Sequence, residues 1–229
     1  MLAAREALAL ARLRSLGSLR RAADAALAAA SPDAAREVSE RLVRLCAAGA
    51  GPAPDAARLA ERQAELVDAP DILELAEAEL LAPRDTEARR EVEAAARQVA
   101  TVTAFVPLAL ADVAVALLAN LRMIRRIAEI YGGRSGVVGG WRLTRAVLTH
   151  LVATGAVSVG DDMIGSVAGG GLLSKLSRRF GEGVVNGALT ARVGVAAIEV
   201  CRPLPFRRER APKVSNLVRQ ALTGLFDRG

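Results

Sequence analysis

Cysteine, histidine and aromatic residues are scarce in this chain of 229 residues, which has two Cys, one His and six aromatics. Cys46 and Cys201 lie far apart and form no CxxC pair, which excludes a disulfide framework and a zinc knuckle. With His150 alone, one chain cannot build a paired-histidine metal site, and no nucleophile with its base can be placed beside it. We therefore expect no metal site, no cofactor site, no catalytic residue and no enzyme. A hydrolase using Asp161, Asp162 or His150 is the weakest alternative.

Signals of nucleic-acid and nucleotide binding are also missing. The chain has a formal net charge of +6, but it shows neither a basic strand interleaved with aromatics nor a helix-turn-helix pattern. The glycine-rich residues 165–177 lack the GxxxxGK(S/T) order of a phosphate-binding loop, since Lys175 follows Ser174 and no strand pattern precedes them. We expect no nucleic acid or nucleotide to bind, and we interpret this segment as a flexible connection between buried helices.

Ala, Leu and Arg are abundant and β-branched runs are few, so helix propensity is high almost throughout and an all-α fold is predicted. Charge divides the chain near residue 100, because residues 1–98 carry a net charge of −3 and residues 99–229 one of +9. We predict a helical, acidic, soluble region at 1–82, followed by a hydrophobic, membrane-associated helical domain at 83–229.

Prolines and glycines mark the expected helix ends in the first region. The first thirty residues indicate an amphipathic helix, because charges interrupt the apolar run that a signal peptide needs. A new helix is expected after Ser31, with Pro32 where its missing N–H does no harm, and residues 47–55 indicate a loop. Further breaks are expected at Pro70 and at Pro83-Arg84-Asp85, where Asp85 would cap the next helix.

Carboxylates recur after Asp68, at Asp71, Glu74, Glu77 and Glu79. No His, Cys or glycine-turn loop lies among them, unlike the ligand loop of a calcium site. We interpret them as a solvated helix face.

The segment from Val99 to Leu121 is long and apolar enough to cross or embed in a bilayer, since roughly 20 apolar residues are needed. Asp112 lies near its centre, and a carboxylate in hydrocarbon or a dry core should face a partner helix, a countercharge or water. On a helical wheel, a small and polar stripe that we expect to face protein contains Ala109, Asp112, Ala116 and Asn120.

A second apolar helix is expected at 182–201. Its small residues share one side, a pattern that allows close helix approach in membranes: Gly183, Gly187, Thr190, Gly194, Ala197 and Cys201. Arg192 and Glu199 share the other side, about 10 Å apart along the axis, so each is expected to seek a partner on another helix. We predict a buried ion pair between Asp112 and Arg192, within a buried polar network of Asp112, Asn120, Arg192 and Glu199.

A third apolar segment covers residues 143–160, but the orientation of the segments is not determined. Arginines flank both ends of the segments at 99–121 and 182–201, so the positive-inside rule does not assign an orientation to either segment. Either some segments form a buried or interfacial helical core, or the charge bias is overridden. We favour the first alternative.

Three sequence motifs, PLALAD at 107–112, NLRMIRRIAEIYG at 120–132 and TARVGVAAIEVCRPLPF at 190–206, resemble the YcjF-type family of bacterial inner-membrane proteins. The resemblance runs from about residue 5 to 225 and is densest over 83–206. It implies a multi-pass inner-membrane protein of unassigned activity, whose C-terminal domain of unknown function also occurs attached to certain bacterial GTPases. Family members usually carry a hydrophobic hairpin ahead of the region matching 1–30, and this chain begins after it, so we expect no firm anchoring by that hairpin.

Two functions remain as expectations. The first is a non-enzymatic, membrane-associated scaffold or regulator of a partner, such as a P-loop GTPase-like protein, in the bacterial inner (cytoplasmic) membrane. The alternative is a membrane pathway for a small solute or ion that uses Asp112, Asn120, Arg192 and Glu199, because charged groups at membrane depth often mark conduction. Membrane lipid is an expected partner in both, and assembly into a homo-oligomer stays open.

Overall fold

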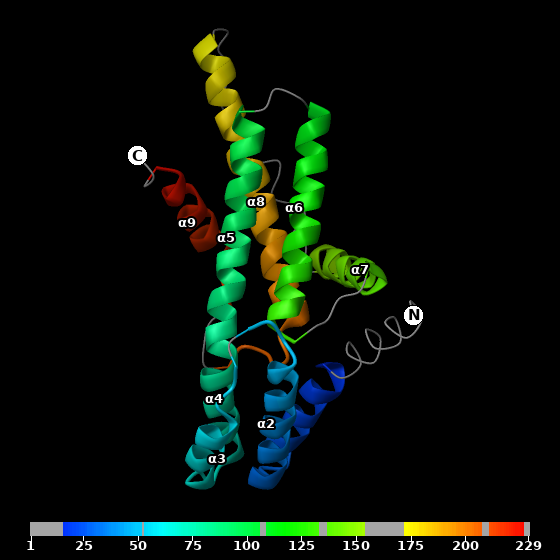
Figure 1. The fold of residues 1–229 in the computed structure, drawn as a ribbon, viewed down its shortest axis with the longest axis vertical. Coiled ribbons are helices and arrows are strands. Elements are labelled where there is room, and N and C mark those ends of the chain that lie inside the picture. The colour runs from blue at the N-terminus through cyan, green and yellow to red at the C-terminus, as the bar shows by residue number, and fades with distance from the viewer. Residues whose placement is uncertain are drawn as a thin grey trace. The chain divides into compact units, whose positions relative to one another are not determined.

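The structure is a computed structural model, and it describes residues 16–51, 53–105, 109–132, 137–153, 172–207 and 211–226. Every regular element in these residues is helical, which confirms the all-α prediction (Figure 1). After a helix at residues 16–28, the elements are α2 (Pro32–Ala47), α3 (Ala56–Ala64), α4 (Ala69–Ala76), the π-helical turn η1 (Glu77–Leu81), α5 (Ala82–Phe105), α6 (Ala109–Ile130), α7 (Val137–Ala153), α8 (Leu172–Cys201) and α9 (Val214–Phe226).

The helices form two compact units, and α5, α6, α7 and α8 each contribute residues to both. Unit 1 consists of Met1–Ala88, Ile127–Trp141 and Cys201–Ala211, and unit 2 of Arg89–Arg126, Arg142–Val200 and Pro212–Gly229. The expected boundary after residue 82 falls inside unit 1. The division into a soluble, acidic helical region at 1–82 and a hydrophobic helical domain at 83–229 stays a prediction.

Unit 1 has a conventional apolar core. Side chains from residues 16–28, α2, α3, α4 and η1 meet there, with Leu42, Ile72 and Leu81 fully buried. The helix starts agree with the sequence, since the Ser31 hydroxyl accepts from the Ala34 N–H with proline in the first turn, and Asp55 caps α3 in the same way. These caps fix the helices that enclose the core.

The break predicted at Pro83 is wrong. The chain passes from α4 through η1 into α5 without leaving a helical conformation, and Pro83 lies in the first turn of α5. In a regular α-helix the proline ring collides with the carbonyl four residues earlier, that of Glu79. Glu79 lies in the wider π-helical turn, which lets the helix continue past the proline.

In unit 2, the run from Val99 to Leu121 is not one helix. The chain turns back between Phe105 at the end of α5 and Ala109 at the start of α6, so the run forms two antiparallel arms (Figure 1). The sequence has Pro107 in this interval, and proline disfavours a helix interior. The run that the sequence presents as one apolar segment, long enough to cross or embed in a bilayer, is therefore divided between two helices.

The small-residue face of α8, which the sequence predicted to allow close helix approach, packs against α5. A Cβ atom added at Gly183 would lie 2.6 Å from the Ala100 carbonyl oxygen, and one added at Gly194 would lie 2.5 Å from the Val92 methyl groups. All six residues of the predicted small face are buried. Only glycine permits these two close approaches.

One helix in the described part of the chain, Phe180–Cys201 of α8, is long and apolar enough to cross a membrane. The core helix of a soluble protein would pass the same test, so length and composition alone do not show that this helix crosses a membrane.

Candidate functional site

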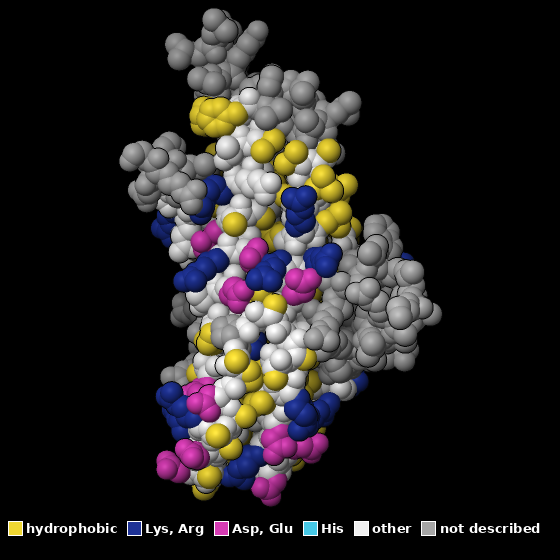
Figure 2. Space-filling model, viewed as in Figure 1, with side chains coloured by type: hydrophobic (Ala, Val, Ile, Leu, Met, Phe, Trp, Pro, Cys, Tyr) yellow, Lys and Arg dark blue, Asp and Glu magenta, His cyan; other side chains and the backbone are white. Residues whose placement is uncertain are grey.

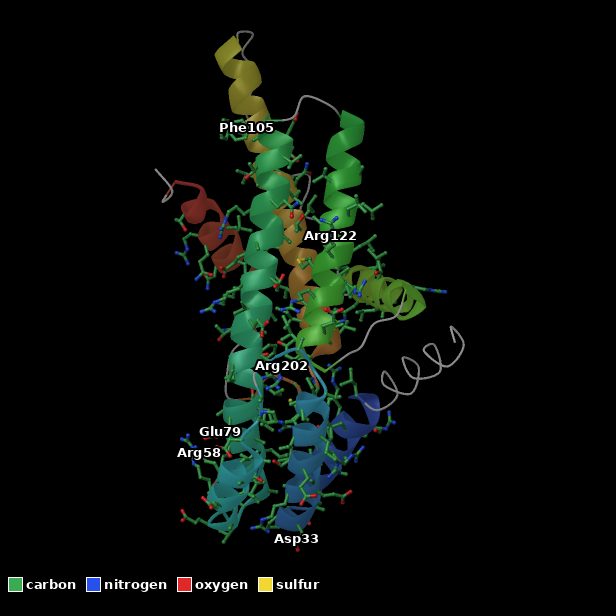
Figure 3. The ribbon with its side chains drawn as sticks, in the orientation of Figure 1. Asp33, Arg58, Glu79, Phe105, Arg122 and Arg202 are labelled. Atoms are coloured by element: carbon green, nitrogen blue, oxygen red, sulfur yellow. The ribbon has the colours of Figure 1, made fainter. Side chains whose placement is uncertain are left out.

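Unit 1 contains a cluster of three buried charged side chains and a buried tyrosine, which come from three stretches of the chain. Glu77 begins η1, Asp85 lies in the first turn of α5, Tyr131 follows α6, and Arg202 follows α8. Each of these four side chains is about 1% exposed. We call them the buried charge cluster, and Arg202 is labelled in Figure 3.

The π-helical turn explains how Glu77 and Asp85 serve one partner. Two residues eight apart in an α-helix, at about 100° per residue, lie roughly 80° apart around the axis. A π-turn adds one residue to a turn, so the same separation behaves like seven residues, which differ by only about 20°. The turn therefore brings both carboxylates to one face of a continuous helix.

Arg202 binds both carboxylates at once. Its Nε donates to the two carboxylate oxygens of Asp85 at 3.0 and 3.1 Å, and its Nη2 donates to Asp85 and to Glu77 at 2.9 Å each. Its Nη1 donates to the Leu204 carbonyl at 2.7 Å, while the Tyr131 hydroxyl donates to Asp85 at 2.5 Å. Charged partners at these distances make the strongest class of protein hydrogen bond.

The non-helical residues 202–207, which we call the strap, close over the cluster from outside. The Phe206 ring lies 3.9 Å from the Arg202 guanidinium carbon, and the Arg207 backbone N–H donates to Glu77. Arg20, from the first helix, donates to the Arg202 carbonyl at 2.6 Å, and the Arg207 side chain donates to Asp24. The strap therefore ties the end of α8 to the first helix of unit 1.

Arg84 is a second fully buried guanidinium beside the cluster. Its Nη1 donates to the Leu80 carbonyl and its Nη2 to the Cys46 carbonyl, at 2.7 and 3.0 Å. A Cβ atom added at Gly51 would lie 3.0 Å from this side chain, so the loop after α2 covers it closely. Among the described residues of unit 1, the buried charges Arg84 and Arg202 balance Glu77 and Asp85.

Burial shifts the protonation equilibria around the cluster. It raises the pKa of the Tyr131 hydroxyl well above its usual value, and the nearby Asp85 carboxylate raises it further. Burial alone would lower the pKa of Arg202, but its bonds to Asp85 and Glu77 outweigh that effect, so the pKa is raised. Burial also raises the pKa of the Cys46 thiol to about 11. At neutral pH the arginine is charged and the other two groups are neutral.

The cluster has a structural role. Protein groups occupy its hydrogen-bond donors and acceptors, and water has almost no access to it. Removing one partner of a buried ion pair typically costs about 3–5 kcal/mol, since the other charge is left buried. In the described part of the chain, no three His, Cys, Asp or Glu side chains gather as metal ligands. The cluster locks the strap, η1 and α5 together.

The four residues that the sequence singled out lie in unit 2. Asn120 is half-buried and donates to the Ala116 carbonyl of its own helix at 2.9 Å. Glu199 binds the ring of His150 on α7 at 2.7 Å, and Arg192 is half-buried with a partner. The Asp112 side chain lies outside the described residues. The ion pair between Asp112 and Arg192, the shared network and the pathway alternative therefore stay predictions.

The sequence interpretation missed the buried charge cluster. Glu77 was assigned to a solvated helix face and Asp85 to a helix cap, and both assignments are wrong because Arg202 holds each carboxylate in the core. The period of a regular α-helix does not place Glu77 and Asp85 on one face, because it takes no account of the π-turn. The available signal was the CRPLPF motif, in which an arginine stands between an apolar helix and two prolines.

Residues 67–227 match the family described as "Domain of unknown function (DUF697)". The chain belongs to the DUF697 family. Relatives of this DUF697 chain include UPF0283 membrane proteins from Rhizobium meliloti (strain 1021), Mesorhizobium japonicum and Agrobacterium fabrum, which are 46%, 44% and 42% identical to it. The alignments cover between 94% and 96% of the chain but 60% of each relative, so the chain spans about three fifths of the length of these curated relatives.

No solved structure matches the chain. The expectation of an uncharacterised membrane-protein family with a domain of unknown function is confirmed. The DUF697 match begins at residue 67 and includes all four members of the buried charge cluster.

Proposed function

We propose that this DUF697 chain is a non-enzymatic, membrane-associated scaffold or regulator, in which unit 1 offers a docking surface to a protein partner. We place it in the bacterial inner membrane, in line with its resemblance to the YcjF-type family. That resemblance also suggests the partner, a P-loop GTPase-like protein.

The observation that carries the proposal is the contrast between the outer surfaces of the two units. Among the described residues, unit 1 exposes one large apolar side chain, Val67. Unit 2 exposes seven: Phe105, Leu117, Leu118, Leu148, Val152, Phe180 and Leu189. A body with an apolar core and a charged exterior suits water, whereas exposed apolar side chains in number mark an interaction surface.

Within unit 1, α3 is the best docking element. Only Leu59 and Gln63 of its nine residues are buried, so most of the helix faces outward. Between α2 and α3 lies a shallow depression of about 200 Å³, lined in part by Val43, Leu59 and Ala60. Glu40 and Arg44 are the charged residues in its lining, and apolar contacts beside polar and charged ones are the usual anatomy of a protein interface.

The experiment is site-specific photo-cross-linking in bacterial cells that express the chain. A photoreactive residue replaces exposed Glu61 on α3, and a matched variant carries it at exposed Leu118 in unit 2. We expect mass spectrometry to identify a protein with a GTP-binding P-loop in the Glu61 adduct and to find none of it at Leu118. The same protein adduct at both sites, or no protein adduct at Glu61, would contradict the proposal.

A further inference from the structure

The outer face of α6 is apolar, although this helix already has an apolar face in the core. Ala119, Met123 and Ile124 are buried. A second set of side chains recurs at spacings of three and four residues and faces outward, five of them exposed and one half-buried: Ala114, Leu117, Leu118, Leu121, Arg122 and Arg125. We call this set the outer stripe of α6. A helix that is apolar on both faces needs an apolar environment on both.

The neighbouring helix α5 differs, because the outer face of its part in unit 2 is polar. Its exposed side chains include Arg90 and Gln98, and its fully buried ones are apolar apart from a threonine. Glu91 of α5 pairs with Arg126 of α6 at 3.5 Å, and counted from this pair Gln98 lies seven residues along α5 and Leu118 eight residues back along α6. The two exposed side chains are therefore at about the same level on antiparallel helices, one polar and one apolar.

The outer stripe combines leucines with positive charge. It contains two arginines and no carboxylate, and Arg122 follows Leu118 by one helical turn. Arg122 is labelled in Figure 3, and Figure 2 shows hydrophobic side chains gathered over α6 next to the charged side chains that cross α5 and α6. Apolar side chains bordered by arginines are typical of helices that lie in the surface of an anionic bilayer, where the arginines reach lipid phosphates.

A second copy of the chain fits this surface less well than lipid does. In a two-fold dimer both copies contribute the same patch. The arginines of the two stripes would then meet leucines or one another, because the stripe has no carboxylate to offer them. Phosphate groups of lipid supply the missing negative charge, so the charge of the stripe favours a bilayer as its partner.

The charges of α5 bear on whether α8 crosses the membrane. A Cβ atom added at Gly183 would contact Ala100 and one added at Gly194 would contact Val92, so residues 89–97 of α5 lie beside the second half of α8. Five of these nine residues are charged: Arg89, Arg90, Glu91, Glu93 and Arg97. A bilayer that enclosed the whole apolar length of α8 would also enclose these charges, at a high cost in free energy.

We propose that unit 2 lies on the surface of an anionic bilayer, with the outer stripe of α6 in contact with lipid and with α8 kept inside the protein. Leu117 and Leu118 enter the boundary between headgroups and acyl chains, and Arg122 and Arg125 bind lipid phosphates. The helix α8 is apolar because it packs in a core, and it does not cross the bilayer. This inference rests on the membrane association proposed above and is independent of the partner of unit 1.

Vesicle flotation tests the lipid contact, with the full 229-residue chain and vesicles of phosphatidylglycerol and phosphatidylcholine. Leu118→Glu should lower the partition coefficient by about tenfold or more, because it removes a leucine contact and adds a charge that anionic lipid repels. Gln98→Glu is the matched control, since it adds the same charge at the same level on the polar face of α5, and it should leave partition nearly unchanged. Equal partition of the two variants would overturn the assigned contact.

Arg122→Gln tests the headgroup contact separately. It should weaken binding to vesicles that contain phosphatidylglycerol by about fivefold, and it should not change binding to phosphatidylcholine alone. Arg90→Gln removes an exposed arginine from α5 and is the control. Equal losses for the two variants would contradict the proposal, because net charge and not the outer stripe would then account for the attraction.

Cysteine labelling in bacterial spheroplasts that express the chain tests the position of α8. Gly181→Cys and Pro205→Cys place exposed thiols near the two ends of its apolar part, and the unsubstituted chain is the control because Cys46 and Cys201 are buried. We expect a membrane-impermeant maleimide to react with neither new cysteine until the spheroplasts are lysed. Reaction of one before lysis and of the other only after it would show that α8 crosses the membrane, and would overturn the proposal.

The flotation experiment also separates this inference from the proposed function. If the unsubstituted chain binds none of the vesicles, membrane association itself is contradicted. If it binds and Leu118→Glu binds equally well, only the outer stripe as the lipid contact is contradicted. A dimer in mild detergent that Leu118→Glu dissociates, with vesicle binding unchanged, would assign the stripe to a second copy and overturn the proposal.

Discussion

Arg202 binds both carboxylate oxygens of Asp85 although 117 residues separate the two in sequence, and each side chain is about 1% exposed. The pair joins the end of the apolar helix α8 to the start of α5. Because Glu77 shares the same guanidinium, loss of Arg202 would strand two carboxylates in the core of unit 1. The predictions below for the stability of unit 1 follow mainly from this arrangement.

Replacement of Arg202 should be strongly destabilising. Arg202→Ala is expected to lower the free energy of unfolding by about 3–5 kcal/mol, because both carboxylates stay buried without their cation. Denaturation followed by circular dichroism in mild detergent measures the change. Arg62→Ala is the matched control, because Arg62 pairs with Glu79 at the surface and should cost less than about 1 kcal/mol. Equal losses of unfolding free energy for the two variants would show that Arg202 stabilises the fold no more than an exposed arginine does.

Apolar replacement of the whole cluster should recover much of that loss. The triple variant Glu77→Leu, Asp85→Leu, Arg202→Met leaves no unpaired charge, so it should be more stable than Arg202→Ala alone. A triple variant whose loss equals the sum of the three single losses would show that the groups act independently.

Tyr131 should resist ionisation while the protein is folded. It is the chain's single tyrosine, so the phenolate absorbance in the near ultraviolet reports this residue alone. Its raised pKa means that folding favours the neutral hydroxyl, so the associated stability is present below pH about 10 and is lost as pH rises further. We expect phenolate to appear only as the helices unfold, and at an ordinary pKa in denaturant. Ionisation near pH 10 in the folded chain would contradict the burial.

Cys46 adds to the same alkaline sensitivity. Its pKa rises from 9.0 to about 11, so the stability it contributes is complete below pH 9 and disappears between these values. Cys46→Ala should make the unfolding free energy less dependent on pH within that window. An unchanged pH dependence between pH 9 and 11 would count against a buried neutral thiol.

The contact between α5 and α8 should distinguish two glycines that are close in sequence. Gly183→Ala forces a methyl group towards the Ala100 carbonyl, and overpacking of this kind costs about 1–3 kcal/mol. Nothing lies within 4 Å of a Cβ added at Gly181, so Gly181→Ala should be neutral or should stabilise by up to about 1 kcal/mol. Thermal unfolding of the two variants side by side gives the comparison, and equal effects would argue against the close helix contact.

The sequence predicted helix type, the caps at Ser31 and the small face of α8, because each depends on local chemistry or on one helical period. It failed at Glu77 and Asp85, since their shared face exists only with a π-turn that periodicity does not show. It also failed at Val99 to Leu121, where hydropathy measures the length of a run and not a reversal of direction. Long-range pairing, such as that of Asp85 with Arg202, leaves no local pattern.

The central claim is that unit 1 faces water while unit 2 faces lipid, and labelling from within the bilayer tests it most directly. Vesicles that hold the full chain and a photoactivatable diazirine on the lipid acyl chain are irradiated, and the labelled peptides are mapped by mass spectrometry. We expect adducts on peptides that contain Phe105, Leu117 or Leu118, and none on peptides from α2, α3 or α4. Equal labelling of both groups of peptides, or adducts confined to unit 1, would contradict the account.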